Sequence, residues 1–208
     1  MPASTPVSYP RREQRKQRTR AALIRAAHAL FAELGYDNTT LEAVAARAEV
    51  HVQTLYRHFP TKVDLAIAPN LATFDAFCSA IRARPADQDS LDFWRNWVIG
   101  RAAQVTAAGE KDQFLQRLRF SRQEPIYAAA LARLGDAYED ELTHALASDQ
   151  GQAPDESPAP RLVAIMLWGA NRHAQRRWLE ANGKLDLVDE VGKAADSVIA
   201  LVAEGHTW

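Results

Sequence analysis

Apolar residues recur along most of this chain at intervals of three and four positions, the spacing that places them on one face of an α-helix. Alanine and leucine dominate, glycine is sparse, and no long segment alternates apolar and polar residues. The pattern therefore predicts an all-α protein of about nine helices. The expected helices cover about residues 15–34, 41–48, 51–59, 62–82, 90–108, 111–123, 125–147, 160–181 and 186–204.

Several of these boundaries have identifiable chemical signals. Thr39 and Thr40 both offer hydroxyl groups that can cap the second helix. Thr39 has Glu42 three residues further on, which is the spacing of a capping box. Pro69 is expected to kink or interrupt the fourth helix. The segment SDQGQAPDESPAP, residues 148–160, is the clearest linker in the chain.

The stretch HVQTLYRHFPTK, residues 51–62, has an unusual polar face. Val52, Leu55 and Phe59 form one apolar stripe of a helix. The other helical positions hold side chains that can form hydrogen bonds and none that is acidic. With the preceding short helix, this pattern predicts a helix-turn-helix whose second helix enters the major groove of DNA. Tyr56 is open to a second interpretation, in which it joins the apolar stripe as core.

Charge is distributed unevenly along the chain. Residues 1–62 hold ten Lys/Arg and five Asp/Glu, whereas the remainder holds fifteen and twenty-one. A basic first third joined to an acidic remainder indicates one part that faces a polyanion and one part with another role. The alternative is a solvated charged tail, because the basic excess is concentrated in RREQRKQRTR.

The segment TTLEAVAARAEVHVQTLYRHFPTKVDL, residues 39–65, resembles the DNA-binding motif of the TetR family of transcriptional regulators. The preceding AALIRAAHALFAELGYDNTT, residues 21–40, resembles that family's first helix. Glu49 stands where the family usually has glycine, so the turn must be made without a freely left-handed residue. His51 stands where serine or threonine usually caps the third helix, which implies a weaker cap.

The resemblance implies DNA-contacting roles for particular positions. Thr39, Thr40 and Lys62 would lie near phosphates at the starts of two helices. Residues at the start of the recognition helix would reach bases, and later ones would contact the DNA backbone or groove. The basic arm would add salt-sensitive affinity. The expected DNA-contacting residues are Thr39, Thr40, His51, Gln53, Thr54, Tyr56, Arg57, His58, Lys62, Arg15 and Arg18.

Aromatic residues gather in the expected fifth to eighth helices. They form either ordinary core or the wall of a largely apolar pocket for a small-molecule inducer. The candidate ligand-binding residues are Trp94, Trp97, Phe114, Leu118, Tyr127, Trp168, Asn171 and His173. Arg119 and Arg122 are further candidates for a polar or anion-binding contact, with a solvated or interface position as the alternative.

The last two expected helices carry apolar stripes that resemble the family's dimer interface, a four-helix bundle across a two-fold axis. The candidate interface residues are Leu162, Ile165, Met166, Gly169, Val191, Val198 and Val202. The segment NRHAQRRW, residues 171–178, is either a second basic patch or an exposed rim of its helix.

Several classes of protein do not fit the sequence. The single cysteine, Cys78, forms no internal disulfide and suits a reducing cytoplasm. The longest apolar run, LVAIMLWGA at 162–170, is too short to span a bilayer. The six histidines lack a metal-binding spacing, and no glycine loop that cradles phosphate is present. We therefore expect no enzyme, no metal and no cofactor.

Together these features predict a disordered arm at residues 1–14, a helix-turn-helix domain at 15–62 and a ligand-binding and dimerisation domain at 63–208. The expected function is a ligand-responsive transcriptional regulator in a bacterial cytoplasm, most simply a repressor. It would bind a palindromic double-stranded DNA operator as a homodimer and be released by a small-molecule inducer. The alternative is a small-molecule sensor of the same fold whose DNA binding is secondary or non-specific.

Overall fold

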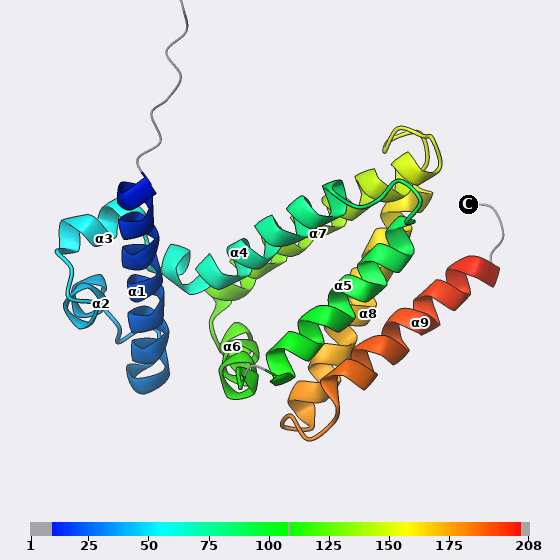
Figure 1. The fold of residues 1–208 in the computed structure, drawn as a ribbon. Helices are drawn as coiled ribbons and strands as arrows, with labels where there is room; N and C mark the ends of the chain where they lie inside the picture. The colour runs from blue at the N-terminus through cyan, green and yellow to red at the C-terminus, as the bar shows by residue number, and fades with distance from the viewer. Residues whose placement is uncertain (1–9, 108, 205–208) are drawn as a thin grey trace, which may run out of the picture. The chain divides into compact units, whose positions relative to one another are not determined.

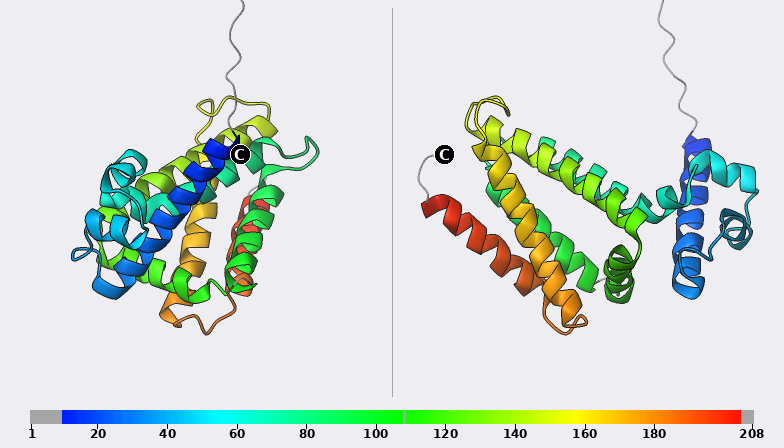
Figure 2. Two further views of the ribbon diagram at one scale, coloured as in Figure 1. Left: turned by 60° about the vertical axis from the view of Figure 1, so that its left-hand side comes forward. Right: turned by 180° about the vertical axis from the view of Figure 1, so that it is seen from behind.

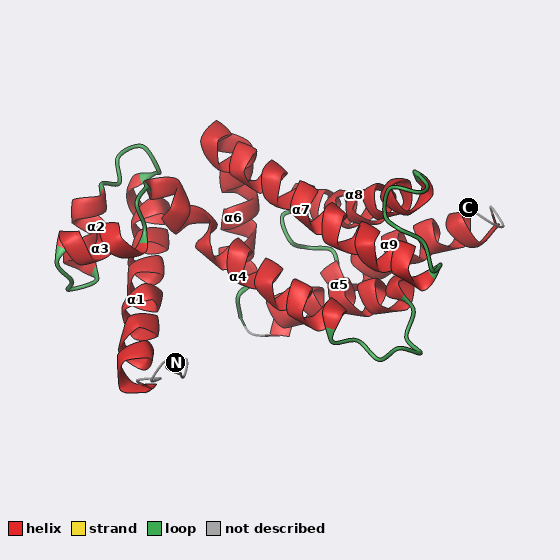
Figure 3. Cartoon of the chain, turned by 90° about the horizontal axis from the view of Figure 1, so that it is seen from above, coloured by secondary structure: helices red, strands yellow, loops and turns green. Residues whose placement is uncertain are grey.

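The computed structural model describes residues 10–107 and 109–204, and these residues form helices and no strand (Figures 1 and 3). This confirms the predicted all-α fold. No helix in the described part of the chain is long and apolar enough to cross a membrane. The helices are α1 (Pro10–Leu34), α2 (Leu41–Arg47), α3 (Val52–His58), α4 (Lys62–Arg82), α5 (Ser90–Ala107), α6 (Lys111–Gln123), α7 (Pro125–Asp149), α8 (Ala159–Glu180) and α9 (Leu187–Glu204).

Two boundaries differ from the sequence-based prediction. Helix α1 begins at Pro10, so residues 10–14, expected in a disordered arm, are helical. The rest of that expected arm, residues 1–9, lies outside the described residues. Helix α4 continues through Pro69, which removes a backbone donor without ending the helix. The chain divides into two compact units at this proline rather than at residue 62.

The first unit is a small three-helix core extended by the start of α4. Helix α1 packs on α2, and α2 packs on α3. Leu34, the last residue of α1, is 49% exposed. Gly35 has a φ of +82°, which turns the chain back and lets Tyr36 pack on Phe31 with ring centres 5.2 Å apart. Tyr36 is 6% exposed and belongs to the core of the first unit, whereas Leu34 does not.

The second unit is a bundle of long helices around an aromatic core. Helix α8 packs on both α7 and α9, and α5 packs on α9 (Figures 1 and 2). The short α6 lies at the end of this bundle where α5 ends and α7 begins. At the centre, the ring of Trp168 meets those of Phe77 and Trp94 edge-on, at 5.4 and 5.7 Å between ring centres. These rings join three helices through buried apolar area.

The turn after α2 is made by a left-handed residue that is not glycine. Glu49 has a φ of 56° and donates its N–H to the carbonyl of Ala46 at 3.1 Å. The next N–H, from Val50, is bonded to the carbonyl of Ala45 at 3.0 Å. These two bonds form a Schellman motif, whose left-handed position favours glycine. The turn is thus made without glycine, as the sequence predicts, but glutamate still adopts the left-handed conformation.

Replacing this glutamate should therefore stabilise the first unit. We expect Glu49→Gly to raise the free energy of unfolding by about 1 kcal/mol relative to Glu49→Ala, because only glycine lacks the Cβ that strains a left-handed residue. Urea unfolding followed by circular dichroism measures the difference. The alanine variant is the matched control, since it also removes the carboxylate. Equal stability of the two variants would contradict a strained turn.

Candidate nucleic-acid interface and ligand site

The start of α2 presents one threonine hydroxyl and hides the other. The Thr40 hydroxyl accepts a hydrogen bond from the Ala43 N–H at 3.1 Å and caps the helix. The Thr39 hydroxyl donates to the Gly35 carbonyl at 2.7 Å, and Thr39 is only 1% exposed. The predicted capping box with Thr39 is therefore wrong. Thr40 stays exposed at a helix N-terminus, whereas the Thr39 side chain has almost no surface to offer a phosphate.

Helix α3 has a buried side and an exposed polar side. Leu55 and Phe59 are 0% and 3% exposed and hold the helix against the core of the first unit. Gln53 and Arg57 are exposed, and Thr54 is partly exposed. The first turn of α3 contains no acidic residue. Donors and mixed donor/acceptors on such a face match the acceptor-rich edge of base pairs and phosphates.

His51 begins this recognition face. It occupies the position before α3 with extended backbone, and its side chain makes no capping hydrogen bond. The weaker cap expected from the sequence is therefore confirmed. The consequence is an exposed imidazole at the helix start that is not committed to the helix backbone.

Tyr56 lies on the exposed side of α3. It is 45% exposed, which excludes the alternative that it packs in the core. Its hydroxyl donates a hydrogen bond to the Glu42 carboxylate at 3.1 Å, and this bond raises the pKa of Tyr56. A phosphate can take this hydroxyl only by replacing the carboxylate, so Glu42 competes with DNA for Tyr56.

Lys62 is held by the protein itself. Its ammonium donates to the carbonyl oxygens of Tyr36 at 2.6 Å, Asp37 at 3.3 Å and Thr39 at 3.1 Å. The same ammonium lies 4.3 Å from the centre of the Tyr36 ring. A compact ammonium suits this cluster of acceptors. The first residue of α4 is thereby tied to the turn that enters α2, a role that the sequence prediction of a phosphate contact did not include.

The other cations of the first unit differ in whether they form an ion pair with a carboxylate. Arg47 forms two hydrogen bonds with the Glu33 carboxylate, at 3.0 and 2.7 Å. Within the described chain Arg15, Arg18 and Arg57 are exposed and form no ion pair with a carboxylate. These three guanidiniums are free to meet phosphates. They remain predicted DNA contacts.

His58 ends α3 in a positively charged neighbourhood. Burial lowers its pKa, and the charges of Arg57, Lys16 and Arg20 lower it further. The lowered pKa favours the neutral imidazole, in which one ring nitrogen donates a hydrogen bond and the other accepts one. His58 is partly buried, and it remains a predicted DNA contact.

The aromatic residues predicted to form a ligand wall lie mostly in the core. Trp94, Tyr127 and Trp168 are 0%, 1% and 7% exposed. Trp97, Phe114 and Leu118 are partly buried and pack against the same core cluster. The rings do not form one wall. One group surrounds Phe77, whereas Tyr127 packs on Phe120 with ring centres 4.8 Å apart.

The polar candidates lie apart from these aromatic groups. His173 is exposed and Asn171 is partly buried on α8. Arg119 donates to the Asn182 side chain, and Arg122 pairs with Glu180 at 3.3 Å. Both arginines therefore extend to the end of α8 and the turn after it. Sequence reasoning did not single out four polar residues of the second unit that are partly buried: Asn70, Arg101, Arg117 and Tyr138.

The arginine-rich segment 171–178 is largely engaged in ion pairs. Arg172 pairs with Glu139 at 3.1 Å, and Arg177 pairs with Glu190 at 2.6 Å. Glu139 is 7% exposed and also lies 3.8 Å from a guanidinium nitrogen of Arg161. The segment therefore holds α8 against its neighbours, which does not favour a free basic patch.

One face of α8 and α9 exposes apolar side chains. Leu162, Ile165 and Met166 are 56%, 39% and 42% exposed. The other expected interface positions, Gly169, Val198 and Val202, are partly buried. Val191 is 2% exposed within the single chain, so its predicted interface role is wrong because its side chain is used in the core. Leu201, 60% exposed, was missed.

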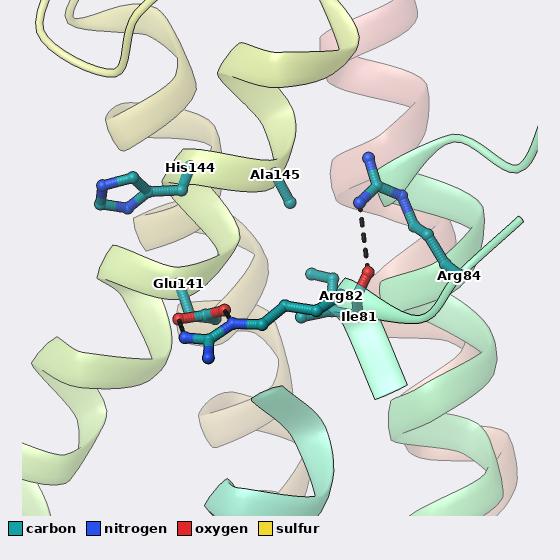
Figure 4. Close-up of a pocket in the computed structure, with 6 residues that line it drawn as sticks. All are labelled: Ile81, Arg82, Arg84, Glu141, His144 and Ala145. Carbon is teal, nitrogen blue, oxygen red and sulfur yellow. Dashed lines mark hydrogen bonds and ion pairs between the residues drawn. The ribbon is translucent and has the colours of Figure 1, made fainter. Parts of the chain in front are cut away.

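A pocket of about 430 Å³ lies between the end of α4 and α7 (Figure 4). Its lining residues are Ile81, Arg82, Arg84, Glu141, His144 and Ala145. Figure 4 shows the Arg82 side chain extended to Glu141, with hydrogen bonds of 2.6 and 2.8 Å. Arg84 pairs with Asp149. None of the predicted ligand residues lines this pocket, and both of its cations already have carboxylate partners.

The role of Lys62 can be separated from a DNA contact by measuring stability without DNA. We expect Lys62→Met to lower the free energy of unfolding by roughly 1–3 kcal/mol, because three carbonyls lose a charged donor. Arg57→Met, which removes an exposed cation of the same unit, should leave stability within about 0.5 kcal/mol. Urea titration of both variants provides the comparison. Equal, negligible effects would mean that the ammonium does not hold the fold.

Comparison with known proteins agrees with this arrangement. The sequence profile described as "Bacterial regulatory proteins, tetR family" matches residues 23–68, and that of the "MftR C-terminal domain" matches residues 88–203. The HTH-type transcriptional regulator TcmR of Streptomyces glaucescens is 30% identical over 197 residues, which are 92% of this chain and 87% of TcmR.

Two further proteins resemble the chain over a part of its sequence or in its fold. The HTH-type transcriptional repressor KstR of Rhodococcus jostii (strain RHA1) is 34% identical over 108 residues, 52% of this chain and 46% of KstR. SmeT, repressor of the Stenotrophomonas maltophilia efflux pump SmeDEF, has been solved with triclosan. That complex has a TM-score of 0.67 and 22% identity, over 88% of this chain and 90% of SmeT. From the TcmR and profile matches, the chain belongs to the TetR family of bacterial regulatory proteins.

Proposed function

We propose that this chain is a transcriptional repressor that binds a palindromic operator as a homodimer and is released by a small molecule. The observation that carries the proposal is the two-sided α3, which buries Leu55 and Phe59 and exposes Gln53, Tyr56 and Arg57. A helix of this kind can rest on its own core while its outer side reaches base edges. A protein that binds an operator on a bacterial chromosome would act in the cytoplasm, which is the location proposed for this chain.

The DNA contacts divide by the chemistry of the side chains. His51, Gln53 and Thr54 would read bases from the first turn of α3, with glutamine suited to adenine. Arg57, His58 and Tyr56 would contact the groove or phosphates, and Tyr56 would exchange Glu42 for phosphate. Thr40 and the exposed Arg15 and Arg18 would hold the backbone, which fixes register without reading sequence.

A second copy of the chain would cover the apolar face of α8 and α9. Leu162, Ile165, Met166 and Leu201 are large apolar residues exposed on these two helices. A two-fold dimer through this face would present two copies of α3, which explains why the operator would be a palindrome. The likeness to KstR and SmeT, both repressors, supports repression as the outcome of binding.

Ligand control would act through α4, which carries residues of both units. Lys62 ties the start of α4 to the turn before α2, and Asn70 accepts a hydrogen bond from Tyr127 of α7 at 3.0 Å. A ligand that changes the packing around α7 would shift the population between DNA-competent and incompetent states. SmeT, which shares this fold, has been solved as a complex with triclosan, which supports a small molecule as the ligand.

Selection from random duplex DNA at near-physiological salt tests the proposal. We expect the full-length protein to recover a palindrome. Gln53→Ala should relax selection at one symmetric position and cost about 1–3 kcal/mol there, because one pair of base contacts is lost. Gln113→Ala, which makes the same change at an exposed position of α6, should leave the palindrome intact.

The opposite result is equally informative. Recovery of unselected sequences, with binding that falls steeply as salt rises, would mean that the basic arm alone holds DNA. The sequence-reading role of α3 would then be wrong.

A further inference from the structure

Arg20 of α1 lies against the residue that follows α3. Its guanidinium is 5.1 Å from the centre of the Phe59 ring, within the range of a cation–π contact. Phe59 directly follows the last residue of α3 and donates its N–H to the Leu55 carbonyl at 2.8 Å. Because Phe59 is only 3% exposed, its ring is a fixed part of the core of the first unit. The guanidinium of Arg20 is therefore held beside the C-terminal end of α3.

No carboxylate neutralises this guanidinium within the described part of the chain. Its N–H groups also form no hydrogen bond there. Arg20 is partly buried, so water screens its charge less than that of a fully exposed arginine. Acidic residues of the same unit bond to other side chains: Glu13 to Gln17, Glu33 to Arg47, Glu42 to Tyr56 and Asp64 to Thr61. The cation is thus fixed in place while its hydrogen-bond donors stay available to an anion.

Other basic groups lie at the same end of α3. Arg57 and His58 directly precede Phe59 in the chain, and the ring centres of His58 and Phe59 are 6.4 Å apart. The Phe59 ring therefore neighbours both the imidazole and the Arg20 guanidinium. Burial is the main cause that lowers the pKa of His58, and nearby positive charges, Arg20 among them, lower it further. An anion at this end of α3 would relieve the repulsion between these charges.

A phosphate of DNA is the anion that this position suits. The first residues of a recognition helix meet base edges, whereas its C-terminal end can contact the DNA backbone. A planar guanidinium matches phosphate oxygens through paired, charge-assisted hydrogen bonds. The exposed Arg15 and Arg18 offer the same chemistry, but no aromatic contact holds their guanidiniums among the described residues. A side chain that is already held in place loses less conformational entropy when its partner binds.

We propose that Arg20 binds a phosphate of the DNA backbone beside the C-terminal end of α3, and that the Phe59 ring positions its guanidinium for this contact. The inference rests on the proposed operator binding and adds a fixed backbone contact to it. Such a contact orients α3 on the duplex without reading its sequence. Arg20 would thereby set the register in which Gln53 and its neighbours meet the bases.

A purely structural role is the alternative. A cation near the C-terminal end of a helix is favoured by the helix dipole, and the ring contact also stabilises the folded chain. This role predicts a lower unfolding temperature when the charge is removed. It predicts no change in the dependence of DNA affinity on salt, because no phosphate contact is lost. Thermal unfolding without DNA and DNA titrations at several salt concentrations therefore separate the two roles.

The test compares Arg20→Met with Arg25→Met in the full-length protein. Methionine removes the charge and keeps an unbranched side chain that can cover the Phe59 ring. Arg25 is exposed on α1, about 140° around the helix from Arg20, and is the matched control. Arg20→Met should bind the selected operator and a scrambled duplex at least about fivefold more weakly at near-physiological salt. The slope of log affinity against log salt concentration should fall by about 0.9 for each copy bound. Arg25→Met should change neither quantity.

Two results would overturn the inference. Unchanged affinity and slope in Arg20→Met would mean that its charge meets no phosphate. A loss confined to the operator would mean that Arg20 reads bases, since a backbone contact does not distinguish sequences. Arg20→Lys keeps the charge and should keep the salt slope. A slope lost in both variants, together with a lower unfolding temperature, would indicate a structural cation and contradict a phosphate contact.

The two duplexes also separate this inference from the proposed function. Equal affinity of the wild type for operator and scrambled duplex would reject sequence reading by α3, whereas a smaller salt slope in Arg20→Met would still support the phosphate contact. A recovered palindrome with an unchanged slope in Arg20→Met would reject only the phosphate contact.

Discussion

Within the first unit, the ammonium of Lys62 ties the start of α4 to the turn that precedes α2. Helix α1 ends at Leu34, and the following turn leaves carbonyl oxygens that need donors. Lys62 supplies three hydrogen bonds to this turn, at Tyr36, Asp37 and Thr39. Because the same turn leads into α2, the start of α4 and the entry to the helix-turn-helix are held together. The orientation of α3 then follows from the burial of Leu55 and Phe59.

Some cations of the first unit are bonded to other groups of the fold, whereas others form no ion pair within the described residues. Lys62 donates to backbone carbonyls, and Arg47 pairs with Glu33. Both cations therefore contribute to the stability of the first unit. Arg57 is exposed without an ion pair in the described residues, and Arg117 is partly buried in the same condition. An exposed guanidinium without an ion pair is suited to meet a phosphate, which is the role proposed for Arg57.

The sequence predicts what depends on local pattern. Periodicity of 3.6 residues identifies the helices, and the apolar stripe of α3 identifies its buried side, because both are set by neighbours in the chain. It does not predict that Arg122 finds Glu180 while Arg117 finds no acid, since that depends on residues 58 positions away. Nor does it show that Lys62 faces carbonyls rather than solvent. The ion-pair partner of a long side chain is determined only by how the helices pack against one another.

Sequence reading by the exposed side of α3 is tested most directly by comparing the affinity of the full-length protein for its selected operator and for a scrambled duplex of the same composition, at near-physiological salt. The protein should bind the operator at least about a thousandfold more tightly than the scrambled duplex, as expected for base contacts added to phosphate contacts. Equal affinity for the two duplexes would contradict the account, because only sequence-independent phosphate contacts would then hold DNA.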